Sequence, residues 1–168
     1  DLKNRFVDSM PFVPSDNEKR AQRCKEIFAI QASGLAKRIE HVGSNGVVVG
    51  ISGGLDSTLA LLVSVSAMKL LGKNNSDILG VTMPGFGTTD RTYQNAIDLM
   101  KSLGVTIKEI SIKDACVLHM KDIEHDSLVK DITYENTQAR ERTQILFDLA
   151  NKHGKLLVGT GDLSELAM

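Results

Sequence analysis

The sequence contains few cysteines, and their spacing limits what they can do. Cys24 and Cys116 are its only two, and neither lies in a Cys-x-x-Cys pattern. The spacing argues against a zinc site or a disulfide framework, and isolated thiols are typical of the cytoplasm. We expect a cytoplasmic protein in which both cysteines are buried in the core.

The chain also lacks a charge excess and a long apolar run. With 20 Lys and Arg against 21 Asp and Glu, its formal net charge is −1, which gives no general attraction to nucleic acid or to an anionic membrane. The longest uncharged segment, residues 43–55, is interrupted by glycines and polar residues and is too short to span a bilayer. We therefore expect no nucleic-acid partner and no membrane span.

The residues that are present suit one globular domain. A length of 168 residues with 42% hydrophobic and 24% charged residues is ordinary for a chain with a single core. Residues 1–14 contain two prolines and no period, and are predicted to form an extended arm before a domain at 15–168. Because the chain begins at Asp1 and stops at Met168 within a helical pattern, we expect the domain to be truncated at its C-terminal end.

Short apolar runs alternate with helical periods along the domain. The predicted strands cover residues 47–51, 78–83, 105–112 and 155–160. The first helix is predicted to start at a capping box of Ser15 and Glu18. The later helices are predicted to start near Asp56, at Thr89 or Asp90, at Lys113, at Tyr134 and after Gly161. The alternation predicts a Rossmann-like open parallel sheet with helices on both faces, and right-handed crossovers predict the strand order 3-2-1-4. The charged stretch at residues 121–133 is predicted to be a mobile loop.

The most informative stretch is residues 46–57, with the sequence GVVVGISGGLDS. Its β-branched run is typical of a buried strand, and Ser52, Gly53 and Gly54 end that strand in a tight turn before a helix. Adjacent glycines let backbone N–H groups approach an anion, and a helix N-terminus adds unpaired N–H groups. The stretch is neither a Walker A loop nor a Gly-x-Gly-x-x-Gly fingerprint. It predicts a lysine-free phosphate-binding loop, the alternative being a plain turn capped by Asp56.

Asp56 and a second polar cluster add detail to this site. A carboxylate in a phosphate-binding loop repels its ligand unless a cation lies between them, so Asp56 indicates Mg²⁺. Thr160, Asp162, Ser164 and Glu165 follow the fourth predicted strand, next to the first in the predicted order. The two clusters are therefore expected to meet in one crevice at the carboxyl ends of the strands.

These residues carry two resemblances. The run from Ser52 to Ser57 resembles the Ser-Gly-Gly-x-Asp-Ser signature of the PP-loop ATP pyrophosphatases, which have an adenine nucleotide alpha-hydrolase-like fold. Residues 134–140 (YENTQAR) and 158–166 (VGTGDLSEL) resemble segments of NAD synthetases, and residues 82–88 (TMPGFGT) look most like the glutamine-dependent branch. The similarity extends from about Arg20 to the last residue.

The resemblance implies a reaction and its participants. Nicotinic acid adenine dinucleotide and ATP would form a carboxyl adenylate with release of pyrophosphate, and ammonia would then displace AMP to give NAD. Mg²⁺ is the implied cofactor. The implied partners are a glutaminase domain of the same parent chain, absent here, and further copies of the protein, with at least a dimer expected.

The resemblance also implies roles for particular residues. The implied ATP-binding residues are Gly50, Ile51, Ser52, Gly53, Gly54, Leu55, Asp56, Ser57 and Thr160, with Val81 and Met83 added as our interpretation of the adenine side. Asn136, Arg140 and Glu165 are implied to bind the dinucleotide, and Asp56 and Glu165 the metal. The alternatives are an ion pair of Arg140 with a neighbouring glutamate, helix-dipole compensation by Glu165, and simple burial of Val81 and Met83.

Three other functions remain open from the sequence. Another PP-loop enzyme, such as a GMP synthetase, would share the glycine loop but not the segments at residues 134–140 and 158–166. A non-catalytic adenine-nucleotide-binding module would share the whole site without turnover. The uncharged helix at residues 58–68 also fits a dimerisation scaffold.

Overall fold

The structure is a computed structural model that describes residues 4–6, 10 and 13–161. Its elements are α1 (Asn17–His41), β1 (Val47–Gly50), α2 (Leu55–Leu70), a short 3₁₀ helix η2 (Asn75–Asp77), β2 (Ile78–Thr82), α3 (Asp90–Leu103), β3 (Thr106–Glu109), α4 (Lys113–Asp122), α5 (Ile132–His153) and β4 (Leu156–Val158). The last predicted helix and much of the predicted arm lie outside the described residues. None of the described helices is long and apolar enough to cross a membrane.

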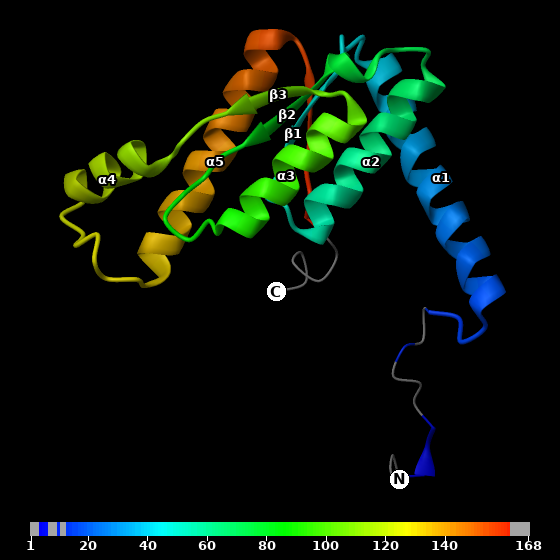
Figure 1. The fold of residues 1–168 in the computed structure, drawn as a ribbon, viewed down its shortest axis with the longest axis horizontal. Coiled ribbons are helices and arrows are strands. Elements are labelled where there is room, and N and C mark those ends of the chain that lie inside the picture. The colour runs from blue at the N-terminus through cyan, green and yellow to red at the C-terminus, as the bar shows by residue number, and fades with distance from the viewer. Residues whose placement is uncertain (1–3, 7–9, 11–12, 162–168) are drawn as a thin grey trace.

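The four strands form one parallel sheet in the order β3-β2-β1-β4, which confirms the predicted order (Figure 1). β1 is central: its Val48 pairs with Leu79 of β2 on one side and with Leu157 of β4 on the other. Each crossover contains at least one helix, as parallel neighbours require. All four strands therefore end at the same edge of the sheet.

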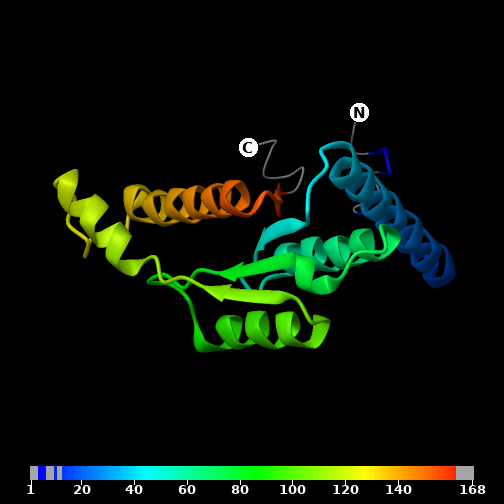
Figure 2. The same ribbon diagram turned by 90° about the horizontal axis from the view of Figure 1, so that it is seen from above.

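The strand side chains alternate between two cores, one on each face of the sheet. Val47 and Val49 of β1 pack with buried residues of α1, α2 and α3. Val48 packs on the other face with buried residues of α4 and α5. Figure 2 shows α3 and α5 on opposite sides of the sheet. The period-2 alternation of a strand buried on both faces thus produces the three-layer arrangement.

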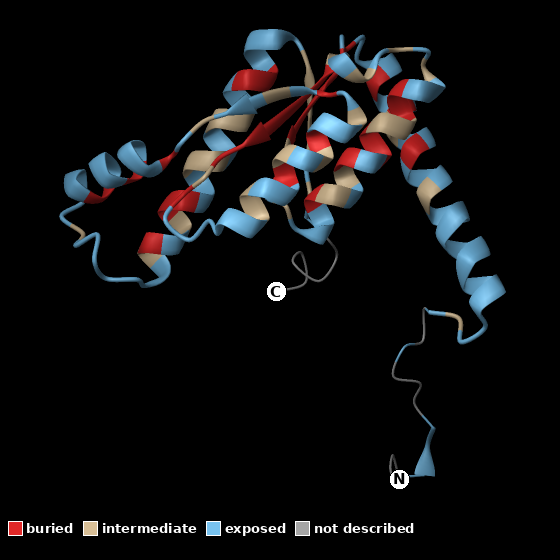
Figure 3. Cartoon of the chain, in the orientation of Figure 1, coloured by how far each residue is buried: buried red, intermediate tan, exposed pale blue. Residues whose placement is uncertain are grey.

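Helix α1 differs from the prediction at its start and in its burial. Its N-cap is Asp16 instead of Ser15, because the Asp16 carboxylate accepts hydrogen bonds from the backbone N–H groups of Glu18 (2.8 Å) and Lys19 (3.3 Å). The buried residues of α1 all lie between Ala32 and Ile39, and its N-terminal half projects beyond the sheet (Figure 3). Cys24 is therefore exposed, so its predicted burial is wrong, whereas Cys116 is buried as predicted.

Helix α5 begins earlier than predicted, at Ile132. Asp131 caps it by accepting hydrogen bonds from the N–H groups of Thr133 (2.9 Å) and Tyr134 (3.0 Å). The Tyr134 N–H and the His125 ring hold the pKa of Asp131 below its usual value. Because α4 also continues to Asp122, the connection is shorter than the loop predicted at residues 121–133.

Gly34 offers a direct test of how α1 is stabilised. It lies in the helix interior, and a Cβ added there meets no atom within 4 Å. Gly34→Ala should raise the free energy of unfolding by about 0.5–1 kcal/mol, because alanine loses less backbone entropy in a helix. Urea denaturation followed by circular dichroism measures the change. Gly43→Ala is the control: Gly43 has φ +63°, so alanine should destabilise there, and a destabilised Gly34→Ala would contradict the expectation.

Candidate active site

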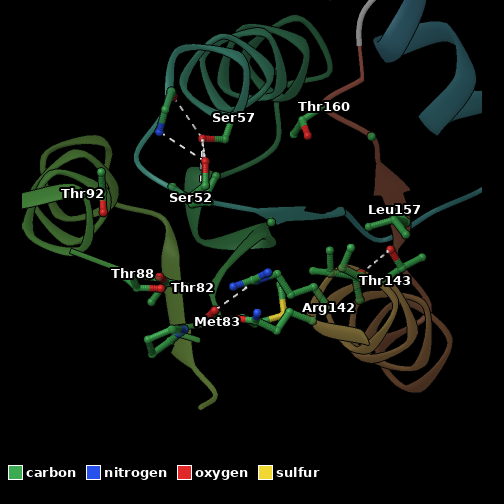
Figure 4. A pocket seen from close by; sticks show the side chains of 18 of the residues that line it. Ser52, Ser57, Thr82, Met83, Thr88, Thr92, Arg142, Thr143, Leu157 and Thr160 are labelled. Atoms are coloured by element: carbon green, nitrogen blue, oxygen red, sulfur yellow. Dashed lines mark hydrogen bonds between the residues drawn. The ribbon is translucent and has the colours of Figure 1, made fainter. Parts of the chain in front are cut away.

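A cavity of about 900 Å³ opens at the carboxyl ends of β1, β2 and β4 (Figure 4). Its volume lies within the range of roughly 300–1,000 Å³ that is usual for ligand pockets. The described residues that line it come from the strand ends, the glycine loop, the α3 side and one face of α5: Gly50, Ile51, Ser52, Gly54, Ser57, Thr82, Met83, Pro84, Gly87, Thr88, Thr92, Glu135, Gln138, Ala139, Arg142, Thr143, Leu146, Phe147, Leu157, Val158, Gly159 and Thr160. The cavity lies at the switch point between β1 and β4 that the topology predicts.

Two serine hydroxyls organise the loop between β1 and α2. Ser52 Oγ lies 3.1 Å from Ser57 Oγ and accepts a hydrogen bond from the Gly54 N–H (3.2 Å). Ser57 Oγ in turn donates to the Gly54 carbonyl (3.1 Å). Both serines line the cavity, and their hydroxyls lie together at its upper side in Figure 4. The two serines of the motif therefore form hydrogen bonds within the loop, and these bonds hold it in one conformation.

The same loop presents backbone N–H groups that have no acceptor. The first backbone bond of α2 runs from the Thr58 N–H to the Gly54 carbonyl (3.1 Å). The N–H groups of Gly53, Leu55, Asp56 and Ser57 make no hydrogen bond within the described part of the chain. Unpaired amides at a helix N-terminus, together with the positive end of the helix dipole, bind anions. The loop is thus suited to a phosphate group.

At Gly53 the loop lies in close contact with α3. Its φ of +85° is a left-handed value that side chains rarely adopt, and a Cβ built there would lie 2.1 Å from the Thr92 carbonyl oxygen. Both observations require glycine at this position. The backbone of α3 therefore limits how far the glycine loop can move on that side.

The opposite wall is formed by α5 and the segment after β2. Gln138, which is buried, accepts a hydrogen bond from the Phe86 N–H at its Oε1 (3.1 Å). Arg142 Nε donates to the Met83 carbonyl (3.2 Å). The Phe86 ring also packs on Tyr134, with ring centroids 5.5 Å apart. These contacts tie the exit of β2 to α5.

Charge in the cavity is sparse. Among the described residues that line it, Arg142 is the only cation and Glu135 the only carboxylate. Burial lowers the pKa of Arg142 from its usual value, and Cys116 and Glu135 act in the opposite direction. Burial also raises the pKa of the Cys116 thiol, and the negative charge of Glu141 adds to the shift. Cys116 is therefore a neutral core residue and no nucleophile.

The structure brings together some of the residues singled out in the sequence. Those that line the cavity are Gly50, Ile51, Ser52, Gly54, Ser57, Met83 and Thr160. Thr160 after β4 and Ser52 after β1 thus share one cavity, as the topology predicts. The backbones of Gly53, Leu55 and Asp56 belong to the loop, but their side chains do not line the cavity, and Leu55 is 87% exposed. Glu165 lies outside the described residues.

Three predicted residues lie away from the cavity. Val81 is fully buried in the core on the α5 side of the sheet, which agrees with the burial alternative. Asn136 and Arg140 do not line the cavity, and Arg140 forms no ion pair within the described residues. Their binding roles stay predictions.

The residues of α5 that line the cavity spread over a wide arc of the helix. The cavity face of the helix contains Glu135, Gln138, Ala139, Arg142, Thr143, Leu146 and Phe147, a stripe with the spacing of three and four residues expected for one face. Positions 136 and 140 lie close to this stripe in helical phase, since 100° per residue places each about 20° from position 147, so helical rotation alone does not separate them from the lining residues. The spacing itself was available in the sequence, but the sequence does not say which stripe faces the strand ends.

No group of three or more His, Cys, Asp or Glu residues that could hold a metal occurs among the described residues. Asp56, the predicted ligand, lies exposed in the first turn of α2, beside the unpaired amides. The other predicted ligand, Glu165, belongs to the segment that the structure does not describe.

The fold and the cavity define a class of protein: a parallel α/β domain with a glycine loop, suited to a phosphate group, at the switch point of its sheet. Comparison with known proteins narrows the class. Residues 27–168 match the family model described as NAD synthase. The chain belongs to the NAD synthase family, and this membership favours that family over the other PP-loop enzymes considered from the sequence.

Individual relatives agree with this membership. The chain is 49% identical over 168 residues to a glutamine-dependent NAD(+) synthetase of Mycobacterium leprae (strain TN), covering 98% of this chain and 25% of the relative. It is 36% identical over 134 residues to an NH(3)-dependent NAD(+) synthetase of Pyrobaculum aerophilum, covering 80% of this chain and 48% of the relative. The chain thus spans a quarter to a half of these relatives' length.

A solved structure agrees with the fold. The glutamine-dependent NAD+ synthetase from Acinetobacter baumannii in complex with adenosine diphosphate superposes with a TM-score of 0.77 at 31% sequence identity, covering 84% of this chain and 26% of that chain.

The geometry of Gly53 leads to a prediction about the loop. Gly53→Ala should lower the free energy of unfolding by about 1–3 kcal/mol, because alanine resists the positive φ and would collide with the Thr92 carbonyl. Urea denaturation measures the loss. Gly87→Ala is the matched control in the same cavity, since a Cβ there meets nothing within 4 Å. Equal effects of the two substitutions would show that the contact with α3 does not constrain the loop.

Proposed function

We propose that the protein carrying this sequence catalyses the ATP-dependent amidation of nicotinic acid adenine dinucleotide to NAD. ATP is converted to AMP and pyrophosphate, and a carboxyl adenylate is the intermediate. The observation that carries the proposal is the set of unpaired amides of Gly53, Leu55, Asp56 and Ser57, which lie at one edge of a cavity that α5 closes on the other side. Membership of the NAD synthase family supports the choice of reaction.

The glycine loop suits the pyrophosphate part of ATP. Its amides and the first turn of α2 can donate several hydrogen bonds to phosphate oxygens. Cleavage between the α and β phosphates requires a site that holds the departing pyrophosphate, and preorganised donors do this without reorganisation. The related Acinetobacter enzyme was solved in complex with adenosine diphosphate, which supports an adenine nucleotide as a ligand of this family.

The residues present fit Mg²⁺ bound together with ATP. Mg²⁺ is usually held by one or two carboxylates and by substrate phosphates, with water completing its coordination. Asp56 is an exposed carboxylate that forms no ion pair in the described part of the chain and lies next to the unpaired amides. We propose Asp56 as a metal ligand, with Glu165 as the second. When bound, the ion neutralises phosphate charge.

The proposed chemistry needs no strongly tuned base. A carboxylate oxygen of the nicotinate attacks the α phosphorus of ATP, the bond from that phosphorus to the bridging oxygen breaks, and pyrophosphate leaves with the electron pair. Ammonia then attacks the acyl carbon, AMP leaves and one proton is released to solvent. Adenylation is required because an oxide ion is too poor a leaving group. Positioning by the cavity and neutralisation of charge supply the catalysis.

The cavity offers neutral contacts for the two substrates. Thr82, Thr88, Thr143 and Thr160 bring hydroxyl groups into its lining, and Met83 and Leu157 bring apolar surface for a base. Such a mixture is usual in nucleotide pockets. We retain Asn136 and Arg140 as proposed contacts to the dinucleotide beyond the rim of the cavity.

We further propose that glutamine supplies the ammonia through a glutaminase domain of the same parent chain. The chain covers 25% of the glutamine-dependent Mycobacterium relative, which leaves room there for further domains. Residues 15–168 are then part of the ATP pyrophosphatase domain, and the intact protein is proposed to be at least a homodimer.

The reaction is tested with the intact protein, ATP, Mg²⁺, nicotinic acid adenine dinucleotide and either glutamine or ammonium. NAD, AMP and pyrophosphate should form in equal amounts, as measured by chromatography, and none should form when the dinucleotide is omitted. ATP binding by calorimetry without AMP formation would instead identify a non-catalytic nucleotide-binding module.

Asp56→Asn should abolish Mg²⁺-dependent ATP turnover while leaving the fold intact, because the amide keeps the shape of the side chain but loses its charge. Turnover and circular dichroism measure the two effects. Asp114→Asn is the matched control, since Asp114 is the exposed first-turn carboxylate of α4, remote from the glycine loop in sequence. Unchanged turnover in Asp56→Asn would refute the metal role.

A further inference from the structure

Arg142 is a cation in the cavity lining that has no role in the proposed reaction. It lies on the cavity face of α5, is half-buried, and is the only positively charged residue among the described residues that line the cavity. In Figure 4 its side chain extends from α5 toward the end of β2. The glycine loop contains no lysine, so the unpaired amides are the only other source of positive potential among the described cavity residues.

Arg142 forms no ion pair within 4.0 Å in the described part of the chain, and Glu135 acts on its charge only from farther away. The described residues form two ion pairs within 4.0 Å, Lys37 with Glu40 and His125 with Asp131, and neither involves Arg142. Partial burial nevertheless removes water from the guanidinium and lowers its pKa from the usual value. A partly desolvated cation without a carboxylate in direct contact is costly to keep in a folded protein. A ligand anion would offset that cost.

The guanidinium is held in place at one of its three nitrogens. Nε donates to the Met83 carbonyl at 3.2 Å, and a Cβ built on Gly85 would lie 2.7 Å from Nη2, so the group packs closely against the segment after β2. The N–H groups of the terminal nitrogens make no hydrogen bond within the described residues. A fixed guanidinium fork with free N–H groups matches the oxygens of a phosphate.

We propose that Arg142 binds a phosphate group of the nucleotide ligand, across the cavity from the glycine loop. The proposal rests on the proposed function, which places two phosphate-bearing molecules, ATP and the dinucleotide, in this cavity. Either molecule can supply the phosphate. The loop amides and the Arg142 guanidinium then divide the phosphate oxygens between two walls of the cavity.

The test compares ligands with and without phosphate by isothermal titration calorimetry on the intact protein. Arg142→Gln should weaken binding of ATP or of the dinucleotide by roughly 10- to 100-fold, as expected for loss of a charged hydrogen-bonded contact. Adenosine should bind with unchanged affinity. Arg142→Lys keeps the charge but loses the guanidinium fork, so its affinity for the phosphate ligand should lie between those of the wild type and Arg142→Gln. The ligand that loses affinity identifies the source of the phosphate.

Lys152→Gln is the matched control, since Lys152 is an exposed cation in the last turn of the same helix and does not line the cavity. It should leave every affinity unchanged. Wild-type affinity of Arg142→Gln for both phosphate ligands overturns the proposal, as does an equal loss for adenosine, which would indicate that Arg142 only supports the Met83 segment. Failure of the wild-type protein to bind ATP would overturn the proposed function itself, and with it this inference.

Discussion

The parallel pairing of β1 with β2 on one side and β4 on the other decides where every cavity residue lies. Because parallel strands end at one edge, the loop after β1 meets Met83 and Pro84 after β2 and Thr160 after β4. Those segments are separated by dozens of residues in the sequence. Alternate side chains of the strands are buried on both faces, and this burial fixes the register, since a shift by one residue would exchange the two cores.

The site combines, on that frame, two groups that we propose to bind phosphate. The loop from Ser52 to Ser57 supplies unpaired backbone amides, held in position by its serine hydroxyls and by the close approach of Gly53 to α3. The opposite wall carries Arg142, a cation anchored by the Met83 carbonyl. The backbone N–H groups donate hydrogen bonds in fixed directions and carry no side-chain charge. The guanidinium of Arg142 adds one positive charge on the far side of the cavity. In the proposed function, these groups take the place of the lysine that a Walker A loop would provide.

Much of the fold could be predicted because its signals are local. The buried β-branched strand at Val47, the glycine stops of the helices and the order of strands and helices each follow from neighbouring residues and from the handedness of crossovers. The errors concern ends and exposure. Asp16 outcompetes Ser15 as the cap of α1, and Cys24 is exposed because the first half of that helix extends past the sheet. The position of the cap and the exposure of Cys24 both depend on how the rest of the fold packs against α1, which the local sequence does not specify.

The sequence by itself determined the strand order, the position of the glycine loop and the family, since these depend on short motifs and on patterns that any parallel α/β chain must obey. Only the tertiary structure decided which residues of α5 meet the strand ends: Glu135, Gln138 and Arg142 line the cavity, and Asn136 and Arg140 do not. The physical reason is that a helix with polar residues around much of its circumference has no single rotation dictated by its own residues. Packing against Val48, Val81 and their neighbours on the sheet selects one.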